Sequence, residues 1–96
     1  MNIQPKINSE TGEVVFYYQP ETASRSEAEM IAKERGEDAL IIDHTYVDPT
    51  LRGQGIADKL MQAAADYARG QKRKIIPRCS YARRKMEKES RYQDLW

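Results

Sequence analysis

The chain has 96 residues, of which 32% are charged, with a mean hydropathy of −0.84 and a single cysteine. This length predicts one domain, residues 1–96, with one modest core. The composition excludes a disulfide framework, a zinc site built from several cysteines and a membrane-spanning helix. Residues 1–6 contain no hydrophobic signal core, so we expect a cytoplasmic protein.

Charge is divided unevenly along the chain. Residues 1–49 hold four Lys or Arg and ten Asp or Glu, a net charge of −6, whereas residues 50–96 hold twelve and five, a net charge of +7. A solvated surface on which the charges happen to be segregated would give this pattern. A basic half that faces a polyanion, either a phosphorylated cofactor or nucleic acid, would give it too.

The first half of the chain predicts three strands. Residues 1–12 are polar and end in a turn signal, so we expect a flexible arm. Residues 13–18 are β-branched and aromatic, which is typical of a strand. Residues 26–35 are good helix formers, but apolar and polar positions alternate there and Gly36 follows, so we predict a strand of a hairpin. Residues 39–47 begin apolar on both faces, which predicts an interior strand.

The second half predicts a βαβ unit. Residues 54–70 carry apolar side chains at helical spacing, with Gly70 as a candidate C-cap. Residues 74–79 form the next strand, and Pro77 indicates a sheet edge or a break in pairing. The strands on either side of the helix should therefore be parallel, with a right-handed crossover. We expect a short charged helix over residues 82–89, and residues 90–96 should dock on the domain.

The most informative stretch, residues 47–57, joins the third predicted strand to the long helix. Gly53 and Gly55 allow a backbone turn in which successive N–H groups continue into the unpaired N–H groups of the helix start. Such a turn suits an anion, above all a phosphate. The spacing is neither that of a P-loop nor that of a dinucleotide fingerprint.

Residues 52–57, with the sequence RGQGIA, resemble the R/Q-x-x-G-x-G/A loop of the GNAT acetyltransferase superfamily. Further segments, residues 43–45, 74–80 and 92–95, resemble in order and spacing the minimal single-domain GNAT-like proteins of about a hundred residues. The resemblance implies an α/β fold, a trimmed GNAT core. Its mixed sheet would have three antiparallel N-terminal strands and one parallel strand, with a long helix on one face and a short C-terminal helix. It also implies acetyl-CoA as the bound coenzyme A derivative.

The resemblance implies a cofactor site at the end of the third strand. The pantetheine arm would lie beside Val47, and a backbone N–H near Tyr46 or Val47 would meet the thioester carbonyl. The backbone N–H groups that would bind the pyrophosphate belong to Arg52, Gly53, Gln54, Gly55, Ile56 and Ala57.

Two residues are candidates for the chemistry. Cys79, with basic residues nearby in sequence, could attack the thioester or protonate the departing CoA thiolate; a small buried apolar residue is the alternative. His44, the only histidine, could accept a proton from an amine, although a lone histidine in a strand is more often a packed residue. Asp43 or Tyr81 could also serve as the base. No metal site is predicted.

We therefore predict an N-acetyltransferase that moves an acetyl group from acetyl-CoA to an amine carried by a small molecule or a protein. A CoA-binding or sensing module with little turnover is the alternative, followed by a nucleic-acid or protein interaction domain. Nucleic acid is less favoured because exposed aromatic residues are not interleaved with the two basic runs, residues 69–74 and 83–85. We expect no membrane association and a monomer or weak dimer.

Overall fold

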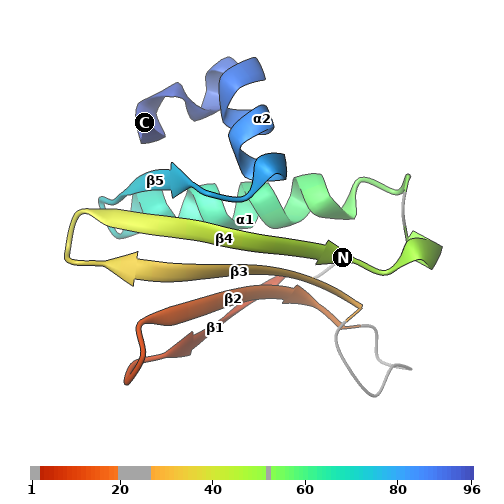
Figure 1. Ribbon diagram of the computed structural model, residues 1–96, viewed down its shortest axis with the longest axis horizontal. Helices are drawn as coiled ribbons and strands as arrows, with labels where there is room; N and C mark the ends of the chain where they lie inside the picture. Colours follow the sequence, from red (N-terminus) through yellow and green to blue (C-terminus); the bar gives the residue numbers. More distant parts are fainter. Residues whose placement is uncertain (1–2, 20–26, 52) are drawn as a thin grey trace.

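A computed structural model describes residues 3–19, 27–51 and 53–96. Five strands form one sheet in the order β1-β2-β3-β4-β5 (Figure 1). The strands are β1 (Gln4–Asn8), β2 (Glu13–Tyr18), β3 (Ala28–Arg35), β4 (Ala39–Val47) and β5 (Lys74–Pro77). The helices are α1 (Ile56–Gly70), α2 (Ser80–Lys88) and two short 3₁₀ helices, η1 (Pro49–Leu51) and η2 (Ser90–Leu95). The mixed α/β fold confirms the predicted class.

The first four strands are antiparallel and β5 is parallel to β4, so the predicted βαβ unit is confirmed. Tertiary pairing prevails over helix propensity in β3, because Ala28, Met30 and Ala32 are fully buried while the residues between them are not. The strand predicted over residues 74–79 is shorter in the structure, because β5 ends at Pro77. As Pro77 indicated, β5 is an edge strand of the sheet.

The N-terminal arm is a correction to the sequence prediction. Residues 4–8 form β1, which pairs with β2 along its whole length, so the antiparallel part of the sheet has four strands rather than three. A polar strand with Pro5 carries none of the usual strand signals, and edge strands tolerate such a composition. The hairpin turn after β1 has Gly12 at φ +76°, a left-handed conformation that favours glycine.

The core lies between one face of the sheet and helix α1 (Figure 1). Alternate residues of β2, β3 and β4 meet α1, whose buried residues are Ile56, Leu60, Met61, Ala64, Ala65 and Ala68. In the described part of the chain, no helix combines the length and the apolar character needed to span a membrane.

A β-bulge in β4 decides which residues face the core. Ala32 lies opposite Ile42 and Ile31 lies opposite His44, so Asp43 is an extra residue in β4. After the bulge, Thr45 lies opposite the buried Met30 and therefore faces the core. If Asp43 were paired in turn, with no bulge, His44 would take the next core-facing position after Ile42.

The C-terminus docks on the domain, as predicted. Tyr92 and Leu95 of η2 are buried, and the Asp94 carboxylate accepts two hydrogen bonds from the Arg69 guanidinium, at 3.0 and 3.1 Å. The Lys74 ammonium also donates to the Asp94 carbonyl, at 2.7 Å. These contacts tie the end of the chain to α1 and β5.

Candidate coenzyme A site

The parallel strands β4 and β5 separate halfway along β4. Their pairing ends at Ile42 and Pro77, and the Ile42 carbonyl then accepts hydrogen bonds from the N–H groups of Arg78 and Cys79, both at 2.9 Å. β4 continues for five more residues, to Val47, without β5 beside it. An open stretch of strand edge results.

The register of β3 and β4 determines which backbone N–H and C=O groups point toward this open edge. Asp48 donates its N–H to the Glu27 carbonyl at 2.8 Å, and hydrogen-bonded pairs alternate along an antiparallel ladder. The Tyr46 groups therefore point toward β3, while the N–H and C=O groups of Thr45 and Val47 point toward the gap left by β5. Of the two predicted donors, the geometry favours Val47 over Tyr46.

The open edge leads into the glycine turn and the start of α1. Gly53 and Gly55 have φ of +83° and +75°, and Gly55 is the N-cap residue, with no side-chain hydrogen bond to cap the helix. The N-cap carbonyl, that of Gly55, accepts a hydrogen bond from the Lys59 N–H at 3.1 Å. The N–H groups of the first helical residues, from Ile56, are therefore available to an anion.

A cleft of about 340 Å³ lies at this junction. Its lining residues are Val47, Leu51, Gly53, Gly55, Ile56, Ala57, Asp58, Tyr81 and Lys85. The cleft thus brings together five of the eight predicted cofactor residues. Of the other three, Arg52 lies outside the described residues, Gln54 is exposed with its amide 3.5 Å from the Thr50 carbonyl, and Tyr46 has an exposed side chain.

Lys85, the last residue of the basic run at residues 83–85, places a positive charge on the cleft. Its ammonium lies 3.0 Å from the Asp58 carboxylate and 2.8 Å from that of Glu89, and Arg91 lies 2.9 Å from Asp58. Burial opposes ionisation of Asp58, but hydrogen bonds from Lys85 and Gln62 lower the pKa of this carboxyl overall. The docking of α2 brings Lys85, and not merely the basic run to which it belongs, to the start of α1.

The structure separates the two predicted catalytic residues. The Thr45 hydroxyl lies 3.3 Å from the Cys79 thiol at the mouth of the gap, whereas His44 is exposed on the opposite face of the sheet. Arg78 lies 3.8 Å from the Asp43 carboxylate. Tyr81 is partly buried, and this burial raises the pKa of its phenol, so at neutral pH Tyr81 is a proton donor rather than a base.

The sheet, the gap between its parallel strands and the glycine turn define a fold of the acetyltransferase class. The family model for GCN5-related N-acetyltransferases matches residues 15–95. The chain therefore belongs to the GCN5-related N-acetyltransferase family. Among curated proteins, none is significantly similar to the chain.

Solved structures agree with this assignment. A GCN5-like protein from Staphylococcus aureus, determined by NMR in solution, is 33% identical, with a TM-score of 0.68, over 98% of this chain and 87% of that chain. A ribosomal-protein-alanine N-acetyltransferase from Brucella melitensis biovar Abortus 2308 shares the fold, with a TM-score of 0.65 at 22% identity. The match covers 79% of this chain and 61% of the Brucella chain.

Proposed function

We propose that this chain binds acetyl-CoA at the open edge of β4 and transfers the acetyl group to a primary amine. The observation that carries the proposal is the continuity of one surface. The free backbone groups of Thr45 and Val47 lead into the left-handed turn at Gly53 and Gly55, and then into the unpaired N–H groups of α1. Such a surface suits a ligand that has amides at one end and a pyrophosphate at the other.

Acetyl-CoA supplies an activated acetyl group whose carbonyl carbon can be attacked by an amine. In the proposed complex the Val47 N–H donates to the thioester carbonyl and stabilises the negative charge that develops on its oxygen. The carbon–nitrogen bond forms as the carbon–sulfur bond breaks, and the amine releases one proton. The phenol of Tyr81, on the cleft wall, is a candidate donor to the departing thiolate.

Cys79 offers a second route to the same product. Its sulfur would attack the thioester carbon, releasing the CoA thiolate and forming an acetyl-cysteine. The amine would then attack that carbonyl carbon, the bond to the Cys79 sulfur would break, and the proton lost by the amine would restore the free thiol. The contact with Thr45 places a hydroxyl where it can donate to the thiolate. His44 cannot serve as the base for Cys79 from the other face of the sheet, so any role for it would be toward the amine.

The deciding measurement is isothermal calorimetry with acetyl-CoA, paired with detection of acetylated amine by mass spectrometry. We expect saturable binding at micromolar ligand. No heat at high micromolar acetyl-CoA, with a folded protein, would overturn the proposal.

The separation of His44 from Cys79 favours a second candidate, a CoA-binding module with little turnover. This module would give the same heat of acetyl-CoA binding. The rate of CoA thiol release would be no higher with the protein than in buffer alone. A thiol-trapping assay on the same samples separates the two functions.

A further inference from the structure

Four charged side chains meet beside the cleft at the start of α1. The Lys85 ammonium lies 3.0 Å from the Asp58 carboxylate and 2.8 Å from the Glu89 carboxylate. The Arg91 guanidinium contacts the same two carboxylates, at 2.9 and 2.7 Å. Each carboxylate therefore has two cationic partners, so both carboxylates would stay paired if one of the two cations left the cluster.

The two cations differ in their freedom to move. Lys85 lines the cleft together with Asp58, whereas Arg91 is not among the lining residues. Arg91 stacks on the buried side chain of Tyr92, with the guanidinium carbon 4.9 Å from the ring centroid, and this contact holds the guanidinium in place. A lysine ammonium, in contrast, ends a flexible four-carbon stem. Lys85 is therefore the cation that can turn toward a ligand in the cleft.

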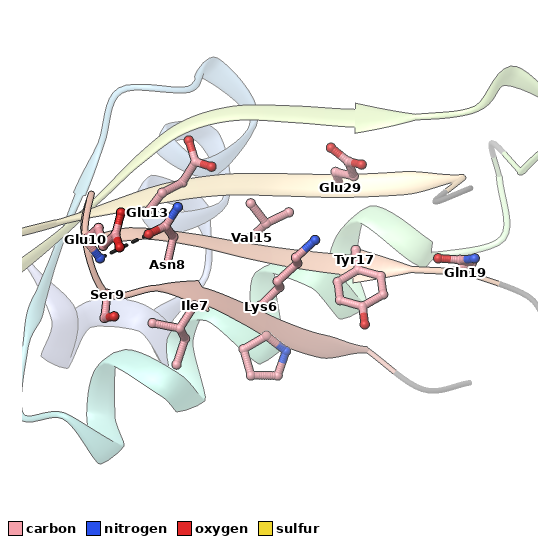
Figure 2. Close-up of a pocket in the computed structure, with 11 residues that line it drawn as sticks. Lys6, Ile7, Asn8, Ser9, Glu10, Glu13, Val15, Tyr17, Gln19 and Glu29 are labelled. Carbon is pink, nitrogen blue, oxygen red and sulfur yellow. Dashed lines mark hydrogen bonds between the residues drawn. The ribbon is translucent and has the colours of Figure 1, made fainter. Parts of the chain in front are cut away.

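A larger hollow, of about 910 Å³ at the N-terminal strands, shows that paired charges are not a general feature of concave surfaces in this domain (Figure 2). Its charged lining residues are Lys6, Glu10, Glu13 and Glu29. Among the described residues, no ion pair joins any of these four side chains, and Asp58 and Glu89 are the only carboxylates with two cationic partners. The doubly paired cluster is thus particular to the cleft.

We propose that Lys85 is an exchangeable cation for the phosphate end of acetyl-CoA. When the ligand enters the cleft, the ammonium moves from Asp58 and Glu89 to a pyrophosphate oxygen, while Arg91 keeps both carboxylates paired. The inference rests on the function proposed above, because it names a further residue that contacts the ligand of that same site. Arg91 acts only through Lys85 and is therefore a positioning residue.

The position of Asp58 suits such an exchange. Asp58 is the third residue of α1, so the ammonium beside it lies within about one turn, roughly 5 Å along the axis, of the unpaired N–H groups of Ile56 and Ala57. Asp58 also lines the cleft, and its charge alone would repel a phosphate. Arg91 and the Gln62 amide, which donates to Asp58 at 2.8 Å, keep this carboxylate compensated after Lys85 has moved.

The first test measures the redundancy of the two cations in the free protein, by urea unfolding of Lys85→Met, Arg91→Met and the double variant. We expect Lys85→Met to leave the unfolding midpoint close to that of the wild type, because Arg91 still pairs both carboxylates. The double variant leaves two neighbouring carboxylates unpaired and should lose more stability than the two single variants together. Additive losses would overturn the redundancy.

The second test compares acetyl-CoA with S-acetylpantetheine, which carries the thioester and both amides but no phosphate, in isothermal calorimetry. Lys85→Met should weaken acetyl-CoA binding by about tenfold or more, since a charge-assisted contact is lost, and should change S-acetylpantetheine binding by less than about twofold. Lys88→Met, an exposed position of the same helix, is the matched control and should leave both Kd values unchanged. Equal losses for the two ligands would overturn the proposal.

Arg91→Met gives the readout that a purely structural ion pair would not move. Without Arg91, the departure of Lys85 would strip both carboxylates of their cations, so acetyl-CoA binding should weaken by about fivefold although Arg91 does not line the cleft. Adding Glu89→Gln removes one competing carboxylate and should restore most of the affinity to Arg91→Met but none to Lys85→Met. Absence of this rescue would overturn the exchange.

The same titrations separate the two proposals. No heat with acetyl-CoA in the folded wild type overturns the function proposed above. Binding in the wild type that is unchanged in both Lys85→Met and Arg91→Met overturns the exchange alone.

Discussion

The Thr45 hydroxyl lies 3.3 Å from the Cys79 thiol, and these two residues are brought together by the bulge in β4 and the end of β5. A hydroxyl can donate to a thiolate, and hydrogen bonds to charged groups contribute more than those between neutral groups. The pair is thus the place where the proposed acetyl-cysteine route can be tested.

Thr45→Val removes the hydroxyl and keeps the side-chain shape. If Cys79 reacts as a thiolate, its rate of acetylation by acetyl-CoA should fall by about 10- to 100-fold, since about 1.5–3 kcal/mol of hydrogen bonding is lost. Thr45→Ser keeps the hydroxyl and should retain most of the rate. Intact-mass spectrometry over time measures the rate, and equal rates in Thr45→Val and the wild type would remove Thr45 from the chemistry.

Cys79→Ser tests the cysteine route itself. We expect self-acetylation to disappear and slow acetyl-CoA hydrolysis to fall to the buffer rate, because a serine hydroxyl without a base is a far weaker nucleophile. The Kd of acetyl-CoA should stay within about twofold. Undiminished turnover in this variant would mean that the amine attacks the thioester directly.

Gly55 allows a matched pair of substitutions in the turn. Its φ of +75° is a conformation that Asn and Asp tolerate better than other residues, and an added Cβ would meet no atom within 4 Å. Both variants should therefore fold with a similar loss of stability. Gly55→Asp places a carboxylate beside the proposed pyrophosphate and should weaken CoA binding at least tenfold relative to Gly55→Asn; similar Kd values in calorimetry would argue against the site.

Asp58 gives the fold an acid-sensitive contact. The pKa of its carboxyl is lowered in the folded state, so its stabilisation is present above the unfolded value of about 3.9 and is lost as pH falls through the folded pKa. Asp58→Asn should lower the free energy of unfolding at pH 7 by about 1 kcal/mol or less. The difference between variant and wild type should shrink below about pH 4 in urea titrations. A constant difference down to pH 2 would contradict this account; Glu87→Gln, on an exposed position of α2, is the control.

Tyr92 offers a substitution that should stabilise the protein. Its side chain is buried, and no hydrogen-bond partner for its hydroxyl is found among the described residues. Tyr92→Phe removes the unpaired group and should raise the free energy of unfolding by up to about 1 kcal/mol. Leu95→Ala, in the same docked segment, should lower it by about 2–5 kcal/mol. A loss of stability in Tyr92→Phe would show that the hydroxyl has a partner, such as water.

Much of this architecture follows from local patterns in the sequence. Residues 13–18 and 39–47 were predictable as strands from their β-branched and aromatic content, and the alternation in residues 28–35 outweighed their helix propensity. β1 could not be predicted, because an edge strand needs only a partner for its backbone and its side chains carry no pattern. The turn at Gly53 and Gly55 was predictable because glycine marks its conformation directly.

The details of the site depend on contacts that a sequence pattern does not record. The bulge at Asp43 lies in a polar run, where no alternation of apolar residues reveals a change of face. The contact between Thr45 and Cys79 and the position of Lys85 depend on how β5 and α2 dock. The sequence therefore locates the loop but does not predict the contact between Thr45 and Cys79.

Because Asp43 is the extra residue of the bulge, Thr45 and Val47 lie on the core-facing side of β4, and His44 and Tyr46 lie on the opposite side. In the proposed complex Thr45 and Val47 would lie beside acetyl-CoA, while His44 and Tyr46 are exposed on the other face of the sheet. A deletion of Asp43 would remove the bulge and leave both sets on their present faces, whereas pairing Asp43 as an ordinary ladder residue would interchange them.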